Sequence, residues 1–190
     1  MKKIAIFASG SGSNAENIIT FFAKDPEITV DSVFCNVPDA FVLKRAEKYQ
    51  IPAYIFTREE LRNPEKLLKE LQAKHIDFIV LAGFLWLIPS FITAAYPNRI
   101  INIHPALLPS YGGKGMYGEK VHQAVIAAKE KQSGITIHYI NEHYDQGDII
   151  FQAKCDITPQ DTPDTLAQKV HALEYEYFPG VIRKAVTHSR

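Results

Sequence analysis

Two residues whose types and spacing suit chemistry lie near the middle of the chain. Asn102 and His104 are separated by one residue in the run IINIHP, so in an extended segment both side chains point to the same side. A histidine exchanges protons near neutral pH, and an amide nitrogen beside it can donate a hydrogen bond to a developing oxyanion. Pro105 restricts the backbone of His104 and helps to fix its direction. The pair therefore predicts acid–base chemistry with oxyanion stabilisation; the alternative is a histidine held in an ordinary turn.

A carboxylate partner for His104 is expected in the turn-rich loop 141–147. A carboxylate close to the imidazole would raise its pKa and orient the ring. Spacing alone does not choose among Asp145, Asp148 and Glu142. Acidic residues and glycine are also common in hairpin turns, so turn formation is the structural alternative for all three acids.

A polar loop near the N-terminus, residues 10–14 (GSGSN), has the composition of a phosphate site. Its glycines let the backbone approach a phosphate, and the free amides at the start of a following helix favour an anion. The glycine spacing also fits a loose dinucleotide fingerprint, but Asn36 stands where such a fold needs an acid to hold the ribose. We therefore predict phosphate binding rather than NAD binding. The alternative is a tight turn in which Ser13 or Asn14 caps the helix.

The segments that position these residues alternate between strands and helices. Apolar or β-rich runs predict five strands, at residues 4–8, 28–34, 53–56, 78–82 and 100–103. Helical periodicity predicts helices at residues 14–24, 40–49 and 63–75. This alternation predicts a parallel sheet with helices on both faces. Ligands of such sheets bind beyond the carboxyl ends of the strands, so the loops 9–14, 83–88 and 102–110 should meet in one crevice.

The second half of the chain has a different pattern. The β-rich runs 135–140 and 148–156 predict an antiparallel strand pair added to the sheet. Residues 162–185 predict a long final helix, bent near Pro179. Residues 111–118 hold four glycines in eight positions and predict a mobile loop that acts as a lid.

The fold class predicted is therefore α/β: a Rossmann-like, mostly parallel sheet with helices on both faces and an antiparallel strand pair in the C-terminal half. A chain of 190 residues is long enough to bury a substantial core, and we expect residues 1–190 to form a single domain. Lys plus Arg and Asp plus Glu both total 21, and this zero net charge argues against a protein that grips nucleic acid.

The cysteines and the hydropathy of the chain indicate whether it carries a metal site, a membrane span or a signal peptide. Cys35 and Cys155 lie far apart and form no CxxC motif, so we expect free thiols and no metal site. No run approaches the ~20 apolar residues that span a membrane. The first apolar run ends after five residues in a glycine-serine loop, which is typical of a strand rather than of a signal peptide. We expect a cytoplasmic protein.

Five motifs run nearly end to end along the chain. They are IFASGSGSN (6–14), LAGF (81–84), INIHPALLP (101–109), GITIHY (134–139) and DQGDIIFQ (145–152). In this order they resemble the phosphoribosylglycinamide formyltransferases of purine synthesis. The string NxHPxLLP is specific for folate-dependent formyltransferases and hydrolases, and the early Gly-Ser-Asn loop narrows the resemblance to this branch. The resemblance implies transfer of the formyl group of 10-formyltetrahydrofolate, a co-substrate, to the amine of glycinamide ribonucleotide, without a metal.

The resemblance also implies a role for individual residues. Catalysis is assigned to Asn102, His104 and Asp145. The substrate phosphate is assigned to Gly12, Ser13 and Asn14, and the glycinamide end of the substrate to Glu174. The folate is assigned to Leu85, Trp86, Leu87, Ile88, Asn102, Ile140, Asn141 and Tyr144. His122 and the glycine-rich loop before it should lie near the site.

The mechanism that the resemblance implies is direct attack of the amine on the formyl carbon. Asn102 would stabilise the oxyanion. Protonated His104, held by Asp145, would assist that charge and help the folate nitrogen to leave. The partners are small molecules, with no nucleic acid and no membrane, and the expected state is a monomer or weak homodimer.

Two departures from the family pattern bear on the folate site. Many members carry arginine after the Ala-Gly-Phe motif, where this chain has Leu85, Trp86 and Leu87. Backbone contacts to the pterin ring survive this change, but a charge contact does not. The segment 110–122 is also longer than in the shorter bacterial members.

Other functions share parts of this pattern. A formyltetrahydrofolate hydrolase or a methionyl-tRNA formyltransferase has the same Asn, His and Asp, but we expect each to carry an additional domain and no glycine-serine phosphate loop. A sugar amine formyltransferase is typically longer. A nucleotide-binding or sensory module on the same fold would bind a phosphate ligand without turnover, since fold alone does not settle function.

Overall fold

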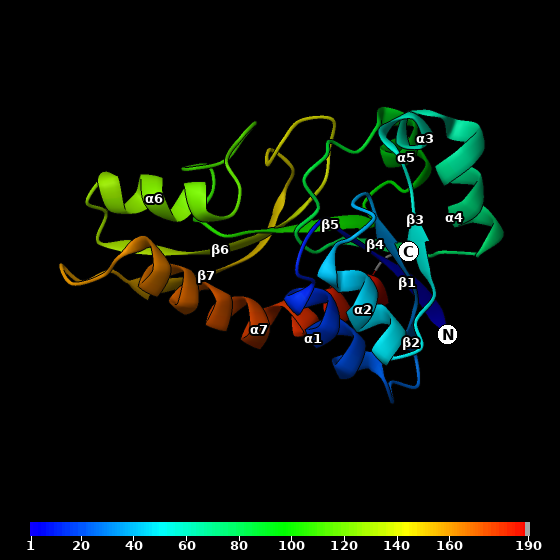
Figure 1. Cartoon of the computed structure of the whole chain (residues 1–190), viewed down its shortest axis with the longest axis horizontal. Coiled ribbons are helices and arrows are strands. Elements are labelled where there is room, and N and C mark those ends of the chain that lie inside the picture. The colour runs from blue at the N-terminus through cyan, green and yellow to red at the C-terminus, as the bar shows by residue number, and fades with distance from the viewer. Residues whose placement is uncertain (189–190) are drawn as a thin grey trace.

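The computed structural model describes residues 1–188, which are organised around a seven-stranded sheet (Figure 1). Its strands are β1 (Lys2–Ala8), β2 (Ile28–Cys35), β3 (Ala53–Ile55), β4 (Phe78–Leu81), β5 (Ile100–His104), β6 (Gln132–Tyr139) and β7 (Ile149–Asp156). Their order across the sheet is β3-β2-β1-β4-β5-β6-β7. The first five strands are parallel, while β6 is antiparallel to both β5 and β7. The predicted fold class is confirmed; the last two residues of the predicted domain 1–190 lie outside the described residues.

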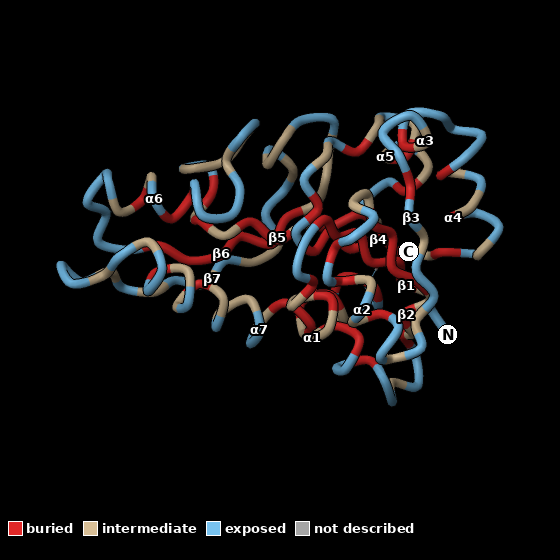
Figure 2. Tube along the Cα trace, in the orientation of Figure 1, coloured by how far each residue is buried: buried red, intermediate tan, exposed pale blue. Residues whose placement is uncertain are grey.

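Helices cover both faces of the sheet. One face carries α1 (Ser13–Phe22), α2 (Phe41–Lys48), α6 (Glu119–Ala127) and α7 (Pro163–His188). The other carries α3 (Arg58–Arg62), the π-helical turn η1 (Pro64–Leu68), α4 (Lys69–Ala73) and α5 (Ser90–Ala95). Because side chains alternate along a strand, β1 supplies Ile4 and Ile6 to the first apolar layer and Ala5 and Phe7 to the second. The central strands are accordingly buried along their length (Figure 2).

The predicted helix 63–75 is confirmed as a helical segment over residues 64–73, but the form of the segment differs. The chain instead forms α3, η1 and α4 in succession, and α3 precedes the predicted start. Thr57 and Glu60 exchange the two hydrogen bonds of a capping box that begins α3, and Asn63 then caps the turn that starts at Pro64. The short helices α5 and α6 were not predicted either. The final helix was predicted, but it extends three residues further and continues through Pro179.

The loops that leave β1 and β4 are tied to each other at the carboxyl edge of the sheet. The amide of Ser9 donates to the carbonyl of Gly83 at 3.1 Å. The hydroxyl of Ser9 accepts from the amide of Leu85 at 3.1 Å and donates to Oδ1 of Asn36 at 2.6 Å. Residues 102–105, at the end of β5, line the same pocket as residues 83–88. The predicted crevice is therefore confirmed for these two segments, while the loop 9–14 is tied to residues 83–85 through Ser9 and does not itself line the pocket.

Gly134 in β6 tests how closely the antiparallel strands approach, and Gly180 in α7 is a glycine with free space around it. A Cβ on Gly134 in β6 would overlap the carbonyl oxygen of Ala153 in β7, so Gly134→Ala must push the strands apart. We expect it to lower the free energy of unfolding by about 2–3 kcal/mol. In α7, a Cβ on Gly180 would meet no atom of the described chain within 4 Å. Gly180→Ala should therefore raise the free energy of unfolding by about 0.5–1 kcal/mol.

Urea denaturation of the two alanine variants and the parent protein measures both effects. Equal stability of the parent and Gly134→Ala would show that the β6–β7 contact is looser than described here.

Candidate active site

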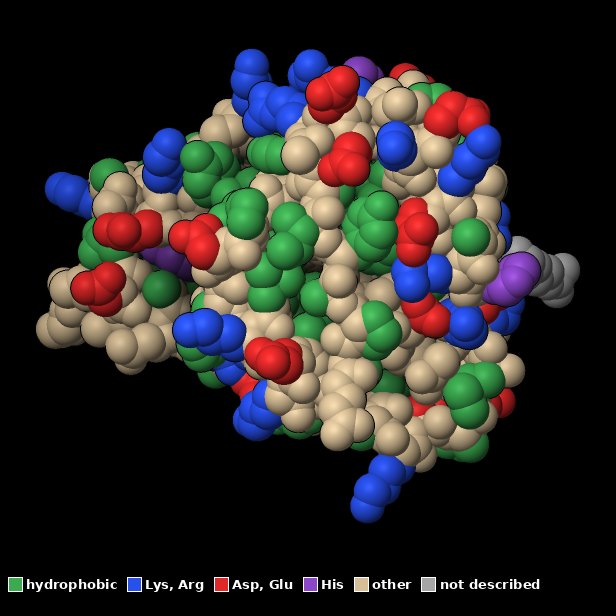
Figure 3. Space-filling view, turned by 45° about the vertical axis from the view of Figure 1, so that its right-hand side comes forward, with side chains coloured by type: hydrophobic (Ala, Val, Ile, Leu, Met, Phe, Trp, Pro, Cys, Tyr) green, Lys and Arg blue, Asp and Glu red, His purple; other side chains and the backbone are tan. Residues whose placement is uncertain are grey.

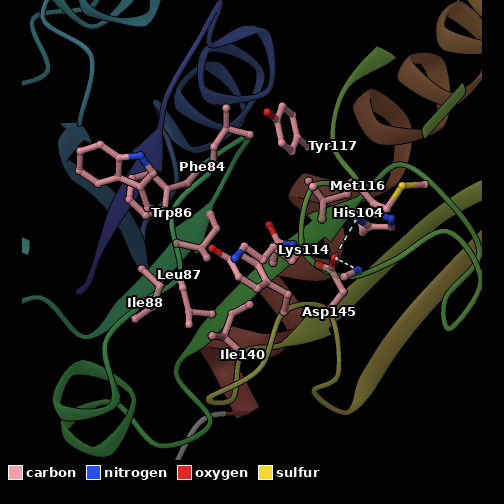
Figure 4. A pocket seen from close by; sticks show the side chains of 18 of the residues that line it. Phe84, Trp86, Leu87, Ile88, His104, Lys114, Met116, Tyr117, Ile140 and Asp145 are labelled. Atoms are coloured by element: carbon pink, nitrogen blue, oxygen red, sulfur yellow. Dashed lines mark hydrogen bonds and ion pairs between the residues drawn. The ribbon is translucent and has the colours of Figure 1, made fainter. Parts of the chain in front are cut away.

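An open pocket of about 1130 Å³ lies where β4 and β5 end (Figure 4). Its apolar side is formed mainly by Phe84, Trp86, Leu87, Ile88 and Ile140. Its polar side carries Asn102, His104, Lys114 and Asp145. The pocket therefore joins a surface suited to a flat apolar ring system with groups suited to proton transfer.

The pairing of β5 with β6 sets the polar side of this pocket. Asn102 lies directly opposite His138, and His104 lies opposite Thr136. Nδ2 of Asn102 is 3.2 Å from Nε2 of His138, whose Nδ1 lies 2.8 Å from the carbonyl of Tyr139. That carbonyl can only accept, so Nδ1 of His138 donates to it, and the Asn102 amide donates to Nε2. One N–H of the Asn102 amide remains for another acceptor.

Asp145 is the carboxylate that the structure brings to His104. Its Oδ2 lies 3.5 Å from Nδ1 of His104 and accepts from the amide of Gly113 at 3.0 Å. Its Oδ1 lies 3.5 Å from Nε2 of His138, so one carboxylate contacts two imidazoles. The competing acids Glu142 and Asp148 are exposed.

His104 is almost fully buried, with 3% of its surface exposed, and both of its ring nitrogens face acceptors. Nδ1 faces Asp145, and Nε2 lies 2.7 Å from the carbonyl of Tyr111. Tyr111 adopts a left-handed backbone conformation, and its hydroxyl donates to Glu130 at 2.7 Å. Tyr111, the first residue of the glycine-rich segment, is thus held through its carbonyl by His104 and through its hydroxyl by Glu130.

Burial has the largest effect on the pKa of this histidine. It lowers the pKa of His104 below its ordinary value of 6.5, and the charge of Asp145 and the Tyr111 carbonyl oppose this shift without cancelling it. Burial alone would raise the pKa of Asp145, but the contacts with His138, His104 and the Gly113 amide hold it below 3.8. Asp145 acts on the His104 pKa in the predicted direction, but burial outweighs it, so that pKa is lowered rather than raised.

The loop 10–14 begins α1 and meets α7. In the described chain no side chain caps α1, so the alternative of a cap by Ser13 or Asn14 is wrong. Nδ2 of Asn14 donates to Oε2 of Glu174 at 2.8 Å, and Nδ1 of His171 lies 3.1 Å from the same oxygen. Within residues 1–188, Oδ1 of the buried Asn14 amide has no hydrogen-bond partner. Glu174 therefore reaches the loop across 160 residues of sequence.

The other predicted residues divide between the pocket and its surroundings. Six of the predicted folate contacts besides Asn102 line the pocket: Leu85, Trp86, Leu87, Ile88, Ile140 and Tyr144. Asn141 does not line it; its Oδ1 accepts from the amide of His143 within the loop. His122 is buried on α6, where burial lowers its pKa, and its Nδ1 lacks a partner among the described residues.

Sequence reasoning missed two contributors to the site. His138 is fully buried in a strand, where a histidine is usually a satisfied core residue, and only its opposition to Asn102 shows otherwise. Lys114 lines the pocket from the glycine-rich segment, which was predicted as a lid without a named side chain. Whether residues 111–118 move stays a prediction.

Comparison with known proteins decides the family. Residues 2–182 match the family model described as formyl transferase. The chain belongs to the formyl transferase family. The family resemblance drawn from the five motifs is thereby confirmed.

Individual relatives carry a more specific name. A phosphoribosylglycinamide formyltransferase of Bacillus subtilis is 36% identical over 189 residues, which cover 97% of this chain and 94% of that protein. The chloroplastic phosphoribosylglycinamide formyltransferase of Arabidopsis thaliana is 39% identical over 95% of this chain, which spans only 64% of the plant protein. The crystal structure of phosphoribosylglycinamide formyltransferase from Bacillus halodurans matches with a TM-score of 0.88 and 36% identity, covering 100% of this chain and 97% of that one.

The described residues hold neither a cluster of metal-ligating side chains nor a membrane-spanning helix. Among residues 1–188, no three His, Cys, Asp or Glu side chains are arranged to hold a metal ion. Over the same residues, no helix has the length and apolar character needed to cross a membrane.

The charge state of His104 can be measured directly. Because the Asp145 carboxylate favours the imidazolium, Asp145→Asn should move the pKa of His104 further below 6.5 than it already lies in the parent protein. NMR titration of the His104 ring resonances gives both midpoints. Asp148→Asn removes an exposed acid from the same loop and should leave the midpoint unchanged. A midpoint that rises, or stays fixed, in Asp145→Asn would contradict the assigned partnership.

Proposed function

We propose that this protein transfers the formyl group of 10-formyltetrahydrofolate to the amine of glycinamide ribonucleotide, giving formylglycinamide ribonucleotide and tetrahydrofolate in de novo purine biosynthesis. The observation that carries this proposal is the position of Asn102, His104 and Asp145 on the polar side of a pocket whose other side is apolar. The names of the relatives, one of them matched along 94% of its length, support the same reaction.

The apolar side of the pocket suits the folate. Its walls are residues 84–88 on one side and Ile140, His143 and Tyr144 on the other, and they present mainly aliphatic and aromatic side chains. Phe84 and Trp86 lie edge to face, with ring centroids 6.3 Å apart, and they fix the first of these walls. Bound 10-formyltetrahydrofolate supplies the formyl carbon, and these walls would hold its ring so that the carbon lies near Asn102.

The loop 10–14 and Glu174 suit the acceptor. The backbone of Gly12, Ser13 and Asn14 would bind the phosphate at the start of α1. Glu174 is held by Asn14 and His171, and it would contact the substrate toward its glycinamide end. The buried Oδ1 of Asn14 is an acceptor without a partner, so a hydroxyl or amine donor of the substrate fits beside it.

The chemistry follows from the resting charges. Neutral His104 would take a proton from the attacking amine, and the imidazolium would then be stabilised by Asp145. The free N–H of Asn102 would donate to the developing oxyanion. His104 would return the proton to the departing folate nitrogen. Positioning and oxyanion stabilisation supply most of the rate, without a covalent intermediate on the enzyme.

One contact must change for this to happen. Nε2 of His104 carries its proton toward the Tyr111 carbonyl and so cannot accept another, while Nδ1 faces Asp145. When the carbonyl moves away, the ring would hold its proton on Nδ1 toward Asp145, which leaves Nε2 as the proton acceptor. We expect the Tyr111 peptide to shift when the acceptor binds.

The test is a spectrophotometric assay of tetrahydrofolate release with and without glycinamide ribonucleotide. His104→Ala should lower kcat about 10²–10⁴-fold, because proton transfer is lost. Asn102→Ala should lower it about 10²–10³-fold, because an oxyanion donor is lost. His188→Ala, at the end of α7, is the matched control and should retain full activity.

The competing functions give different results in the same assay. Near-full activity of His104→Ala would contradict the mechanism. Release without acceptor would identify a hydrolase. Phosphate-ligand binding without turnover would identify a binding module.

The remaining attributes stay predictions. We propose a monomer or weak homodimer that acts as a single formyltransferase domain in the cytoplasm, where thiols such as Cys35 and Cys155, both free in the described chain, are kept reduced. On the face shown in Figure 3, positive and negative side chains are interspersed around apolar ones. This mixed surface supports small-molecule substrates rather than nucleic acid as partners.

A further inference from the structure

The phosphate loop, defined as residues 10–14, is held by α2 at three consecutive residues. The carbonyl of Gly10 accepts from the amide of Val42 at 3.1 Å. The carbonyl of Ser11 accepts from Nε of Arg45 at 2.8 Å. Gly12 has a φ of 73°, and a Cβ there would overlap the Val42 side chain. The shape of the loop thus depends on α2 as much as on α1, where the phosphate amides lie.

Arg45 is the charged member of this contact, and it is restrained on several sides. Its Nη1 pairs with Glu16 on α1, and its guanidinium lies 4.9 Å from the ring centre of Phe41. Glu16 also receives hydrogen bonds from Lys48 at 2.9 Å and from the hydroxyl of Tyr49 at 3.0 Å. Arg45 alone contacts both Glu16 and the backbone of the phosphate loop within the described chain.

The position of Glu16 explains why a cation such as Arg45 is needed beside the phosphate loop. Glu16 lies in the first turn of α1, beside the amides expected to bind the phosphate. A carboxylate there favours the helix but repels a second anion. The guanidinium of Arg45, with Lys48, offsets this charge at close range. Without Arg45, the loop would lose an anchor, and Glu16 would keep only Lys48 as a partner cation, so the site would hold one positive charge fewer.

We propose that Arg45 is a positioning residue for the phosphate subsite: it fixes the Ser11 peptide and neutralises Glu16, so that the amides of α1 can bind a phosphate monoester. This inference rests on the proposed function, because the phosphate belongs to the acceptor substrate. It predicts that Arg45 acts on the affinity for the phosphorylated acceptor and not on the chemical step.

The test compares Arg45→Met with Lys44→Met. Both changes replace a cation on α2 by the same apolar side chain, but Lys44 is exposed and contacts only the Phe41 ring in the described chain. Arg45→Met should raise KM for the phosphorylated acceptor about tenfold, the loss of a charge-assisted contact, with kcat and KM for the folate nearly unchanged. Lys44→Met should match the parent protein.

A dephosphorylated acceptor separates positioning from general damage. With glycinamide ribonucleoside, Arg45→Met and the parent should have the same kcat/KM. An equal loss with both acceptors, or a fall in kcat together with a lower melting temperature, would overturn the proposal. If Arg45→Met does not fold, Arg45→Lys replaces it; a lysine keeps the charge but lacks the planar guanidinium, and KM should rise about threefold.

The part of the proposal in which Arg45 neutralises Glu16 has its own test. Glu16→Gln in the Arg45→Met background removes a carboxylate that only Lys48 still offsets, and it should recover part of the lost affinity. No recovery would overturn that part.

Ribose 5-phosphate binding, measured by calorimetry, decides the role of Arg45 even if glycinamide ribonucleotide is not turned over. A lack of turnover in the parent protein would refute the proposed function alone. Equal affinity of parent and Arg45→Met for ribose 5-phosphate would refute the role of Arg45.

Discussion

Because β6 runs antiparallel to β5 in a fixed register, four polar side chains come to lie on one face of two neighbouring strands. Asn102 is opposite His138, and His104 is opposite Thr136. A slip of one residue would turn the β6 pair to the other face and separate Asn102 from His138. The site therefore depends on this register more than on any single side chain.

Thr136 is what locks that register to the segment after His104. Its hydroxyl donates to the carbonyl of Ala106 at 2.7 Å and accepts from the amide of Leu108 at 3.0 Å. Nε2 of Gln152 on β7 donates to the same hydroxyl at 2.8 Å and to the carbonyl of Leu108 at 3.0 Å. A network of hydrogen bonds thus joins β6, β7 and the chain leaving β5.

The electrostatics of the site follow from the same burial. One carboxylate faces two imidazoles that are almost completely removed from water. Burial makes it costly to charge His104, which lowers the pKa of that ring below its ordinary value. A proton that arrives on His104 during the reaction meets a carboxylate already aligned. The low pKa of His104 is therefore suited to a group that accepts a proton from an amine and gives it up in the next step.

Much of this arrangement could be predicted from the sequence, and the failures have physical reasons. Asn102 and His104 follow from period-two alternation at the end of an apolar strand. Asp145 could not be separated from Asp148, because the choice depends on how a loop folds and not on its composition. His138 was missed because a buried strand histidine is usually structural. The short helix α3 begins at a capping box, and α5 and α6, which have no side-chain cap, depend on tertiary contacts rather than on a long apolar period.

The folate side and the phosphate side of the proposed substrate site are built on the same edge of the sheet. This shared support matters for a reaction that proceeds by direct attack. Ser9 stands between them: its hydroxyl holds the Leu85 amide at the start of the apolar wall, and its chain continues directly into the phosphate loop. Asn36, the residue that replaces the acid of a dinucleotide fold, accepts the hydrogen bond of that hydroxyl. An asparagine oxygen here is an acceptor without a net charge, so it orients Ser9 without adding a negative charge beside a phosphate. The residue that argues against NAD binding is thus the one that couples the carboxyl ends of β2, β1 and β4. Since direct transfer gains most of its rate from the relative placement of its two substrates, a fixed base beneath both is what such chemistry requires.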